Sequence, residues 1–341
     1  MKKPITNLSA SVHARLLNRA RAEARPFDEL VQYYAMERFL YRLSRSTHAD
    51  RFVLKGALML QLWGGPHARA TRDIDLLARS TATVGELVQV VRDCIVADVA
   101  PDGLRFDHDS VTGEEIRLAA RYRGVRLRCR AHLGNARVAL QVDVGFGDVV
   151  TPDVLDIEYP TLLEFAAPRL LGYTPDTAVA EKLEAMVTLD MANTRMKDFL
   201  DIWILAERRA FSGIVLAQAI EATFRRRRTP LPETTPVALS SAFHSAATKQ
   251  SQWQGYLRKN RVAGPTRVEP CSVLLRVRIP WGTCRARALS SRRLGVSRRV
   301  GNELGARGLA LGLHSVRSST IARKSSVSSS SDRFGRISAA D

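Results

Sequence analysis

The sequence predicts an α+β fold in which a small mixed sheet with flanking helices is followed by a helical domain. Three observations favour this class. From about residue 115 to residue 146, apolar and polar residues alternate as in strands, with turn residues between the segments. The N-terminal region and the region beyond residue 161 instead repeat apolar residues every three or four positions, which is typical of helices. Apolar residues make up 45% of the 341 residues, enough to bury a sizeable core.

The first elements of the chain are expected to be two helices, a strand and a short helix. An amphipathic pattern over residues 8–24 ends before Pro26, and a second helix over residues 28–45 can start from Asp28 as its cap. Residues 51–55 then form an apolar strand, and Gly56 separates it from one or two helical turns over residues 57–63.

The middle of the chain is expected to supply the rest of the sheet. A strand over residues 71–78 and a helix over residues 84–96 come first. Three further strands follow, separated by Arg-Gly and Gly-Asn turns, over residues 115–122, 125–132 and 137–146. Short turns between successive strands predict an antiparallel meander.

From Thr161 onward the pattern is helical, interrupted by prolines near residues 230–236. The expected helices cover about residues 175–192, 196–209, 213–227, 236–247 and 249–258. The predicted domains are N-terminal helices over 1–50, an α/β domain over 51–165, a helical domain over 166–260 and a tail over 261–341. A site between the sheet and the helical domain is expected.

The tail is strongly basic. Residues 261–341 carry 16 Lys and Arg against 4 Asp and Glu, while the net charge of the whole chain is +18. Arg, Ser, Gly and Leu dominate without a sustained period, which predicts disorder. Two interpretations stay open: a basic arm that binds RNA or DNA, or a frame-shifted, non-native C-terminus.

Composition excludes several classes of protein. No run reaches 18 apolar residues, so a membrane span is not expected, and the N-terminus lacks the apolar stretch of a secretory signal. The four cysteines include no C-x-x-C pair, which argues against a zinc ribbon, a thioredoxin motif or a disulfide scaffold. A cytoplasmic protein with free thiols is expected.

The pair Asp73 and Asp75 is the strongest indication of chemistry. Alternate residues of a strand project from the same face, so the two carboxylates can converge on one divalent cation. Asp143 lies among apolar residues on another predicted strand, where an unpaired charge is costly, and a neighbouring strand can aim it at the same site. Carboxylate oxygens suit Mg²⁺, and such a site supports phosphoryl or nucleotidyl transfer. The alternatives are an exposed acidic pair and a salt-bridged strand residue.

Gly56 stands between a strand and a helix, where a glycine lets a phosphate approach the backbone at the helix N-terminus. A plain tight turn is the alternative.

The strand, this glycine, the D-x-D pair and the third carboxylate together resemble the nucleotidyltransferase superfamily of the DNA polymerase β type. Over about residues 10–260 the ordered set more closely resembles the AbiEii/AbiGii toxin family. The matching segments are Phe52–Gly56, Arg69–Leu76, Asp143–Gly147, Ala180–Lys182 and Arg195–Asp201.

This resemblance implies a toxin of a bacterial toxin–antitoxin or abortive-infection system. It implies nucleotidyl transfer (EC 2.7.7 type) from an NTP, with Mg²⁺ or Mn²⁺, to an acceptor hydroxyl such as the tRNA 3′ end, and a separate antitoxin partner. The implied catalytic residues are Asp73, Asp75, Asp143, Lys182, Lys197, Asp198 and Asp201, of which the first three match the metal ligands and Lys182 the triphosphate lysine. The implied nucleotide-binding residues are Lys55, Gly56, Ala57, Arg72 and Lys182. Ala57 stands where the superfamily often has Gly or Ser, which removes one hydroxyl contact to phosphate.

For the basic and helical candidate residues, a purely structural role is the alternative to a functional one. Lys197, Asp198 and Asp201 are spaced to share a helix face, as a surface ion-pair ladder or as a polar cluster on a cleft wall. The run Arg225, Arg226, Arg227 and Arg228 lies at a predicted helix end, where it complements the helix dipole or binds tRNA phosphates. The alternatives to a transferase are a non-catalytic nucleic-acid-binding protein and an inactive, decayed toxin.

Overall fold

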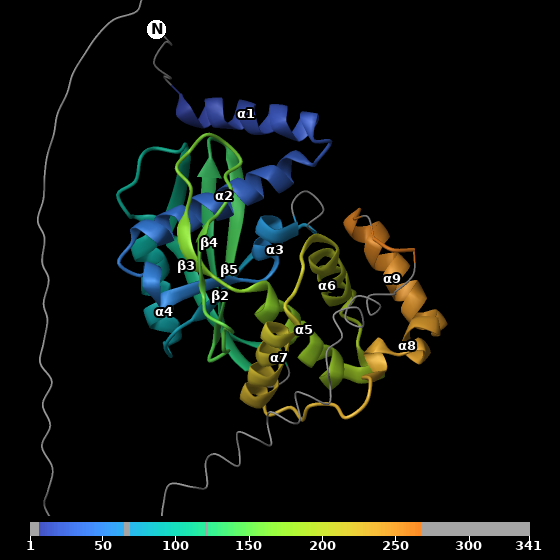
Figure 1. Cartoon of the computed structure of the whole chain (residues 1–341). Helices are drawn as coiled ribbons and strands as arrows, with labels where there is room; N and C mark the ends of the chain where they lie inside the picture. Colours follow the sequence, from blue (N-terminus) through green and yellow to red (C-terminus); the bar gives the residue numbers. More distant parts are fainter. Residues whose placement is uncertain (1–6, 65–68, 120–121, 263, 267–341) are drawn as a thin grey trace, which may run out of the picture. The chain divides into compact units, whose positions relative to one another are not determined.

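A seven-stranded mixed sheet organises the part of the chain that the structure describes (Figure 1). The structure is a computed structural model, and it describes residues 7–64, 69–119, 122–262 and 264–266. The strands in chain order are β1 (Phe52–Lys55), β2 (Asp73–Ala78), β3 (Leu104–Ala119), β4 (Tyr122–Leu133), β5 (Ala136–Phe146), β6 (Leu155–Glu158) and β7 (Arg169–Gly172). Across the sheet their order is β3-β4-β5-β2-β1-β7-β6.

The sheet combines the predicted meander with parallel pairings. Strands β3, β4 and β5 pair antiparallel in succession, as the turns predict. Strand β2 pairs parallel with β5 and antiparallel with β1, and β1 pairs parallel with β7. The α+β fold with a mixed sheet is therefore confirmed.

Two parts of the sheet differ from the expectation. Strands β6 and β7 lie where a helical pattern or no strand was expected, because four residues are too few to display a period. Strand β3 begins at Leu104, eleven residues before the predicted start. The β3–β4 pairing shifts between Asp107 and Thr112, and such an irregularity interrupts the alternation from which a strand is recognised.

The predicted helices form, with small shifts at their ends. They are α1 (Leu8–Ala22), α2 (Phe27–Arg45), α3 (Ala57–Gly64), α4 (Val84–Ile95), α5 (Pro175–Leu189), α6 (Met196–Arg208), α7 (Gly213–Arg227), α8 (Ser241–Ser245) and α9 (Ala247–Asn260). Single turns of 3-10 helix add η1 (Ala49–Arg51), η3 (Asp190–Ala192) and η4 (Val237–Leu239). The helix expected over residues 236–247 is divided into η4 and α8. None of the helices in the described ranges is long and apolar enough to cross a membrane.

Capping residues at the N-termini of α4 and α5 determine where these helices begin. The Thr83 hydroxyl accepts a hydrogen bond from the Glu86 backbone N–H, and the Glu86 carboxylate accepts one from the Thr83 backbone N–H, a reciprocal cap for α4. The Thr174 hydroxyl caps α5, which opens with Pro175. The second cap fixes where α5 leaves β7, and α5 forms part of the site described below.

The hydrophobic core contains side chains from the sheet, from helices that precede its strands in the sequence and from helices that follow them. Phe39 and Leu43 of α2 and Leu87 of α4 pack with the buried side chains of β4 and β5. The same continuous cluster reaches Phe199 of α6 and Trp253 of α9. In Figure 1 helices α5 to α9 group on one side of the sheet. Most of the predicted tail, residues 267–341, lies outside the described residues.

Candidate active site

One row of side chains crosses four strands of the sheet and carries most of the predicted chemistry. Lys55 on β1 is paired in register with Asp75 on β2, and Asp75 with Asp143 on β5. Asp143 is paired in turn with Arg126 on β4. Paired residues on adjacent strands project from the same face, so the register alone assembles the row.

The row opens into a pocket of about 610 Å³. Asp73, Asp75 and Asp143 line it from the sheet, and Lys182 and Lys197 line it from α5 and α6. The structure thus brings the three carboxylates and both predicted lysines to one cavity between the sheet and the helices that follow it. Asp198 lines the same pocket.

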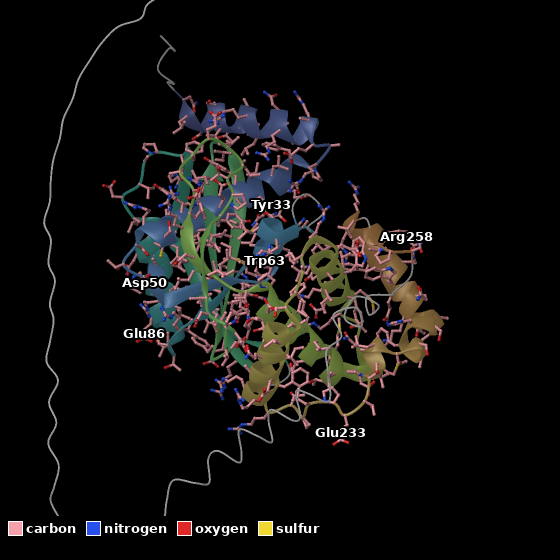
Figure 2. All side chains as sticks on the ribbon, in the orientation of Figure 1. Tyr33, Asp50, Trp63, Glu86, Glu233 and Arg258 are labelled. Carbon is pink, nitrogen blue, oxygen red and sulfur yellow. The ribbon has the colours of Figure 1, made fainter. Side chains whose placement is uncertain are left out.

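Helix α2 holds the segment before β2. The Tyr33 hydroxyl on α2 accepts a hydrogen bond from the Thr71 backbone N–H over 2.9 Å. Trp63 on α3 lines the pocket and is 8% exposed. Both aromatic residues are labelled in Figure 2. Through its hydrogen bond, Tyr33 holds Thr71, two residues before Asp73.

Gly56 is required by close packing against Asp75. Its φ is +72°, and a Cβ built at this position would lie 2.0 Å from Asp75 Oδ2. A side chain here would be strained by the backbone conformation and would push the carboxylate aside. Ala57, the first residue of α3, is buried and lines the pocket.

Burial and like charge act on the carboxylates of the D-x-D pair. Desolvation raises the pKa of Asp73, and the Asp143 charge raises it further against the opposing effect of Arg126. Desolvation also raises the pKa of Asp75, against the opposing charge of Lys55. Each carboxylate is thus held where its negative charge lacks full compensation, an arrangement that favours a bound cation.

Asp143 forms the salt bridge that the sequence analysis gave as the alternative to a metal ligand, but its partner, Arg126, was not predicted. Its two oxygens accept hydrogen bonds from Arg126 Nε over 2.8 Å and from Arg126 Nη2 over 2.7 Å. The Asp143 side chain is 6% exposed and the Arg126 side chain 30%. The only indication in the sequence is the alternation of arginines at 126, 128 and 130 on one strand, which does not reveal their partners.

The donor set agrees in chemistry with a divalent cation. Three carboxylates on adjacent strands supply the hard oxygen ligands that Mg²⁺ and Mn²⁺ take. Among the described residues, however, no group of three His, Cys, Asp or Glu side chains is arranged to hold a metal ion. Both Asp143 oxygens are engaged by Arg126.

Asp198 and Asp201 belong to a buried ion-pair network. Lys182 Nζ lies 3.2 Å from Asp198 Oδ1 and 2.7 Å from Asp201 Oδ2. Asp201 also accepts two hydrogen bonds from the Arg69 guanidinium, and Asp198 pairs with Arg195. Asp198 and Asp201 do share a helix face, but they are 1% and 0% exposed, so the surface ladder is excluded.

The charges of this network are mutually stabilised. Burial opposes the charged form of Lys182, but Asp201 and Asp198 raise its pKa. Burial opposes the charged form of Asp201 as well, and Lys182 and Arg69 hold its pKa below the ordinary value. Lys182 is therefore neutralised by two carboxylates, a property the sequence pattern does not reveal.

Lys197 differs from Lys182. It lines the pocket, retains solvent exposure, and within the described part of the chain makes no ion pair or side-chain hydrogen bond. Partial burial lowers its pKa, and the neighbouring Arg69 and Arg195 lower it further, while its charge acts on both Asp73 and Asp75. Lys197 is the cation of α6 that faces the D-x-D pair.

Lys55 lies in a second buried network. Its Nζ donates to Asp148 Oδ2 over 2.9 Å and to the Tyr173 hydroxyl over 3.2 Å, and Glu181 Oε1 lies 3.3 Å away. Arg227 on α7 completes the cluster, 3.3 Å from both Asp148 and Glu181. The three partners of Lys55 and the place of Arg227 in this cluster were not predicted. Burial alone would lower the pKa of Lys55, but the acidic neighbours raise it well above the ordinary value.

The remaining basic candidates are dispersed. Arg72 lies at a bend before β2, is exposed and does not line the pocket. Arg225 pairs with Glu221 on the surface, Arg226 donates to the Gly147 carbonyl, and Arg227 is held in the buried cluster. Arg228 ends the helix in a left-handed conformation. The four arginines therefore do not form a common patch, and this weakens a phosphate-binding role for the run.

A family model described as "Nucleotidyl transferase AbiEii toxin, Type IV TA system" matches residues 38–275. No curated protein matches the chain with significance. Two similar solved structures come from Helicobacter pylori. The protein JHP933 is 14% identical, with a TM-score of 0.45, and the match covers 78% of this chain and 97% of that one. A protein provisionally described as a nucleotidyltransferase is 14% identical, with a TM-score of 0.46, covering 74% and 96%.

Proposed function

The chain belongs to the AbiEii nucleotidyl transferase toxin family, and from this premise we propose that it is a metal-dependent nucleotidyltransferase. It moves the nucleoside monophosphate of an NTP to an acceptor hydroxyl, which loses its proton, and pyrophosphate leaves; the candidate acceptor is the tRNA 3′ end. The observation that carries the proposal is the register of β2 and β5, which sets Asp75 beside Asp143 with Asp73 in the same pocket.

Asp73, Asp75 and Asp143 are the residues that would hold Mg²⁺ or Mn²⁺. When bound, the cation supplies charge neutralisation for the phosphates and lowers the pKa of an oxygen that it contacts. The protein contributes a pocket that is already shaped, with the carboxylates fixed by the sheet. Rigid placement of this kind is the main resource of enzymes that transfer phosphoryl groups.

Lys197 is the residue we assign to the triphosphate. It is the α6 lysine without an ion-pair partner among the described residues, and it lines the pocket opposite the D-x-D pair. Lysine serves as a compact point charge for phosphate. Lys182, the residue expected from the family pattern, is engaged by two buried carboxylates. We assign it, with Asp198 and Asp201, to positioning α6.

Gly56 and Ala57 are assigned to nucleotide approach. The turn they form passes directly beside Asp75, and the first backbone N–H groups of α3 follow it. Such groups attract phosphate oxygens. Lys55 precedes this turn, and its ion pairs with Asp148 and Glu181 stabilise it. The Lys55 charge also acts on Asp75.

The family supports a toxin that acts with a cognate antitoxin protein. We propose that it works in the cytoplasm, where NTPs and tRNA are available.

The test is a transfer assay with each of the four NTPs, radiolabelled at the α-phosphate, together with Mg²⁺ and total tRNA. We expect one or two NTPs to label RNA, and periodate oxidation of the RNA 3′ end to abolish labelling. Label on the protein instead would move the acceptor from RNA to protein. Salt-sensitive tRNA binding with no label from any NTP would reject the transferase and favour a nucleic-acid-binding protein.

A further inference from the structure

The pairing of Arg126 with Asp143 conflicts with the metal site to which Asp143 is assigned. Both carboxylate oxygens accept hydrogen bonds from the same guanidinium, at 2.8 and 2.7 Å. A divalent cation that binds Asp143 needs at least one of those oxygens. It would also bring two positive charges close to the guanidinium, and like charges repel.

Arg126 is placed so that it can leave this pairing. Its side chain is 30% exposed and lines the pocket, while Asp143 is 6% exposed and fixed in the middle of β5. An ion pair with one partly exposed member contributes modestly to stability. A planar guanidinium binds a phosphate with the same bidentate geometry that it uses for a carboxylate.

Resting on the proposed function, we propose that Arg126 is a positioning residue that competes with the metal for Asp143. In the metal-free chain it holds the third carboxylate in place and neutralises it. When cation and nucleotide enter, the cation takes Asp143 and the guanidinium turns to a substrate phosphate. Metal and nucleotide then each favour binding of the other, because each helps to break the same ion pair.

The test compares variants by binding of Mn²⁺ alone, measured from the electron paramagnetic resonance signal of the free ion. Arg126→Gln removes the competing guanidinium, and Arg128→Gln is the matched control. Arg128 lies two residues away on β4, pairs with Glu114 and does not line the pocket. Removal of Arg126 should strengthen Mn²⁺ binding at least about fivefold, the lower end of usual coupling. Arg128→Gln should change it less than about twofold.

Two further variants separate competition from a general charge effect. Arg126→Lys keeps the charge and should bind Mn²⁺ with an affinity between those of the wild type and Arg126→Gln. In Arg126→Gln combined with Asp143→Asn the gain should vanish. Equal or weaker Mn²⁺ binding by Arg126→Gln, or an equal gain in Arg128→Gln, would overturn the proposal. Urea unfolding of each variant establishes that the fold is retained.

The transfer assay supplies a second readout. In Arg126→Gln the half-saturating Mg²⁺ concentration should fall while KM for the NTP rises; an unchanged KM for the NTP would remove the phosphate-binding half of the proposal. The Mn²⁺ measurement needs no turnover. A wild type that transfers no nucleotide would therefore reject the proposed function, whereas the absence of a specific Mn²⁺ gain would reject the role of Arg126.

Discussion

Single residues in this protein show how close packing and buried charge shape the site. Gly56 has a positive φ and leaves no room for a side chain beside Asp75. Glu37 on α2 is 2% exposed, 2.8 Å from Arg38 Nη2, and accepts a hydrogen bond from the Leu162 N–H. The first residue was predicted from the sequence as a phosphate-approach position, whereas the burial of the second could not be seen in a helical pattern.

Replacement of Gly56 by alanine should destabilise the protein and disturb Asp75. The left-handed backbone and the clash with the carboxylate together should cost about 2 kcal/mol in the free energy of unfolding, measured with urea. Gly85 is the control, because a Cβ there meets nothing within 4 Å and the residue lies in α4. Gly85→Ala should be neutral or stabilise by up to about 1 kcal/mol. Equal effects of both changes would contradict this account of Gly56.

Glu37 should make stability depend on pH. Burial raises its pKa to about 7, although Arg38 opposes the shift. Because the folded state binds the proton more tightly than the unfolded state, this group's contribution to stability is full below about pH 4.5 and is lost as pH rises through 7. The loss is on the order of 3 kcal/mol. Urea unfolding should show that Glu37→Gln is more stable relative to the wild type at pH 8 than at pH 5. A stability difference between the two proteins that does not change with pH would refute this.

Among the elements, α6 is held in place by buried charge. Asp198 and Asp201 face Lys182 on α5, and Asp201 also binds Arg69 just before β2. This face of α6 thus connects α6 with α5 and with the segment before β2, beside the pocket. The spacing of the two aspartates predicted their common face, but their partners come from other elements and could not be inferred from local sequence.

Asp201→Asn should therefore be strongly destabilising. It leaves the buried Arg69 without its carboxylate partner and Lys182 with Asp198 alone, and loss of one member of a buried pair costs about 3–5 kcal/mol. Glu158→Gln is the control, since its pair with Arg169 is 61% and 84% exposed. That change should cost less than about 1 kcal/mol. Urea unfolding of the two variants tests the contrast, and an Asp201→Asn protein as stable as the control would show that the network contributes little.

At the scale of the whole molecule, the sequence predicted the elements better than their contacts. Long periodic segments such as α2 and the meander were found, whereas β6 and β7 were too short to recognise. Asp143 was expected near the D-x-D pair, and the parallel β2–β5 register places it there. Arg126 and Tyr173 were missed because pairing between strands and burial between distant helices depend on the complete fold.

The most direct test of the central claim is nucleotide transfer by Asp73→Asn combined with Asp75→Asn, compared with the wild type under identical conditions. The account predicts that label transfer falls at least about 100-fold, because the charges that bind the cation are removed while the side-chain shapes are kept. The urea midpoint should not fall below that of the wild type, since burial raises the pKa of both carboxyl groups and the substitutions remove their charges. Transfer by the double variant at the wild-type rate would contradict the assignment of the carboxylates and the function built on it.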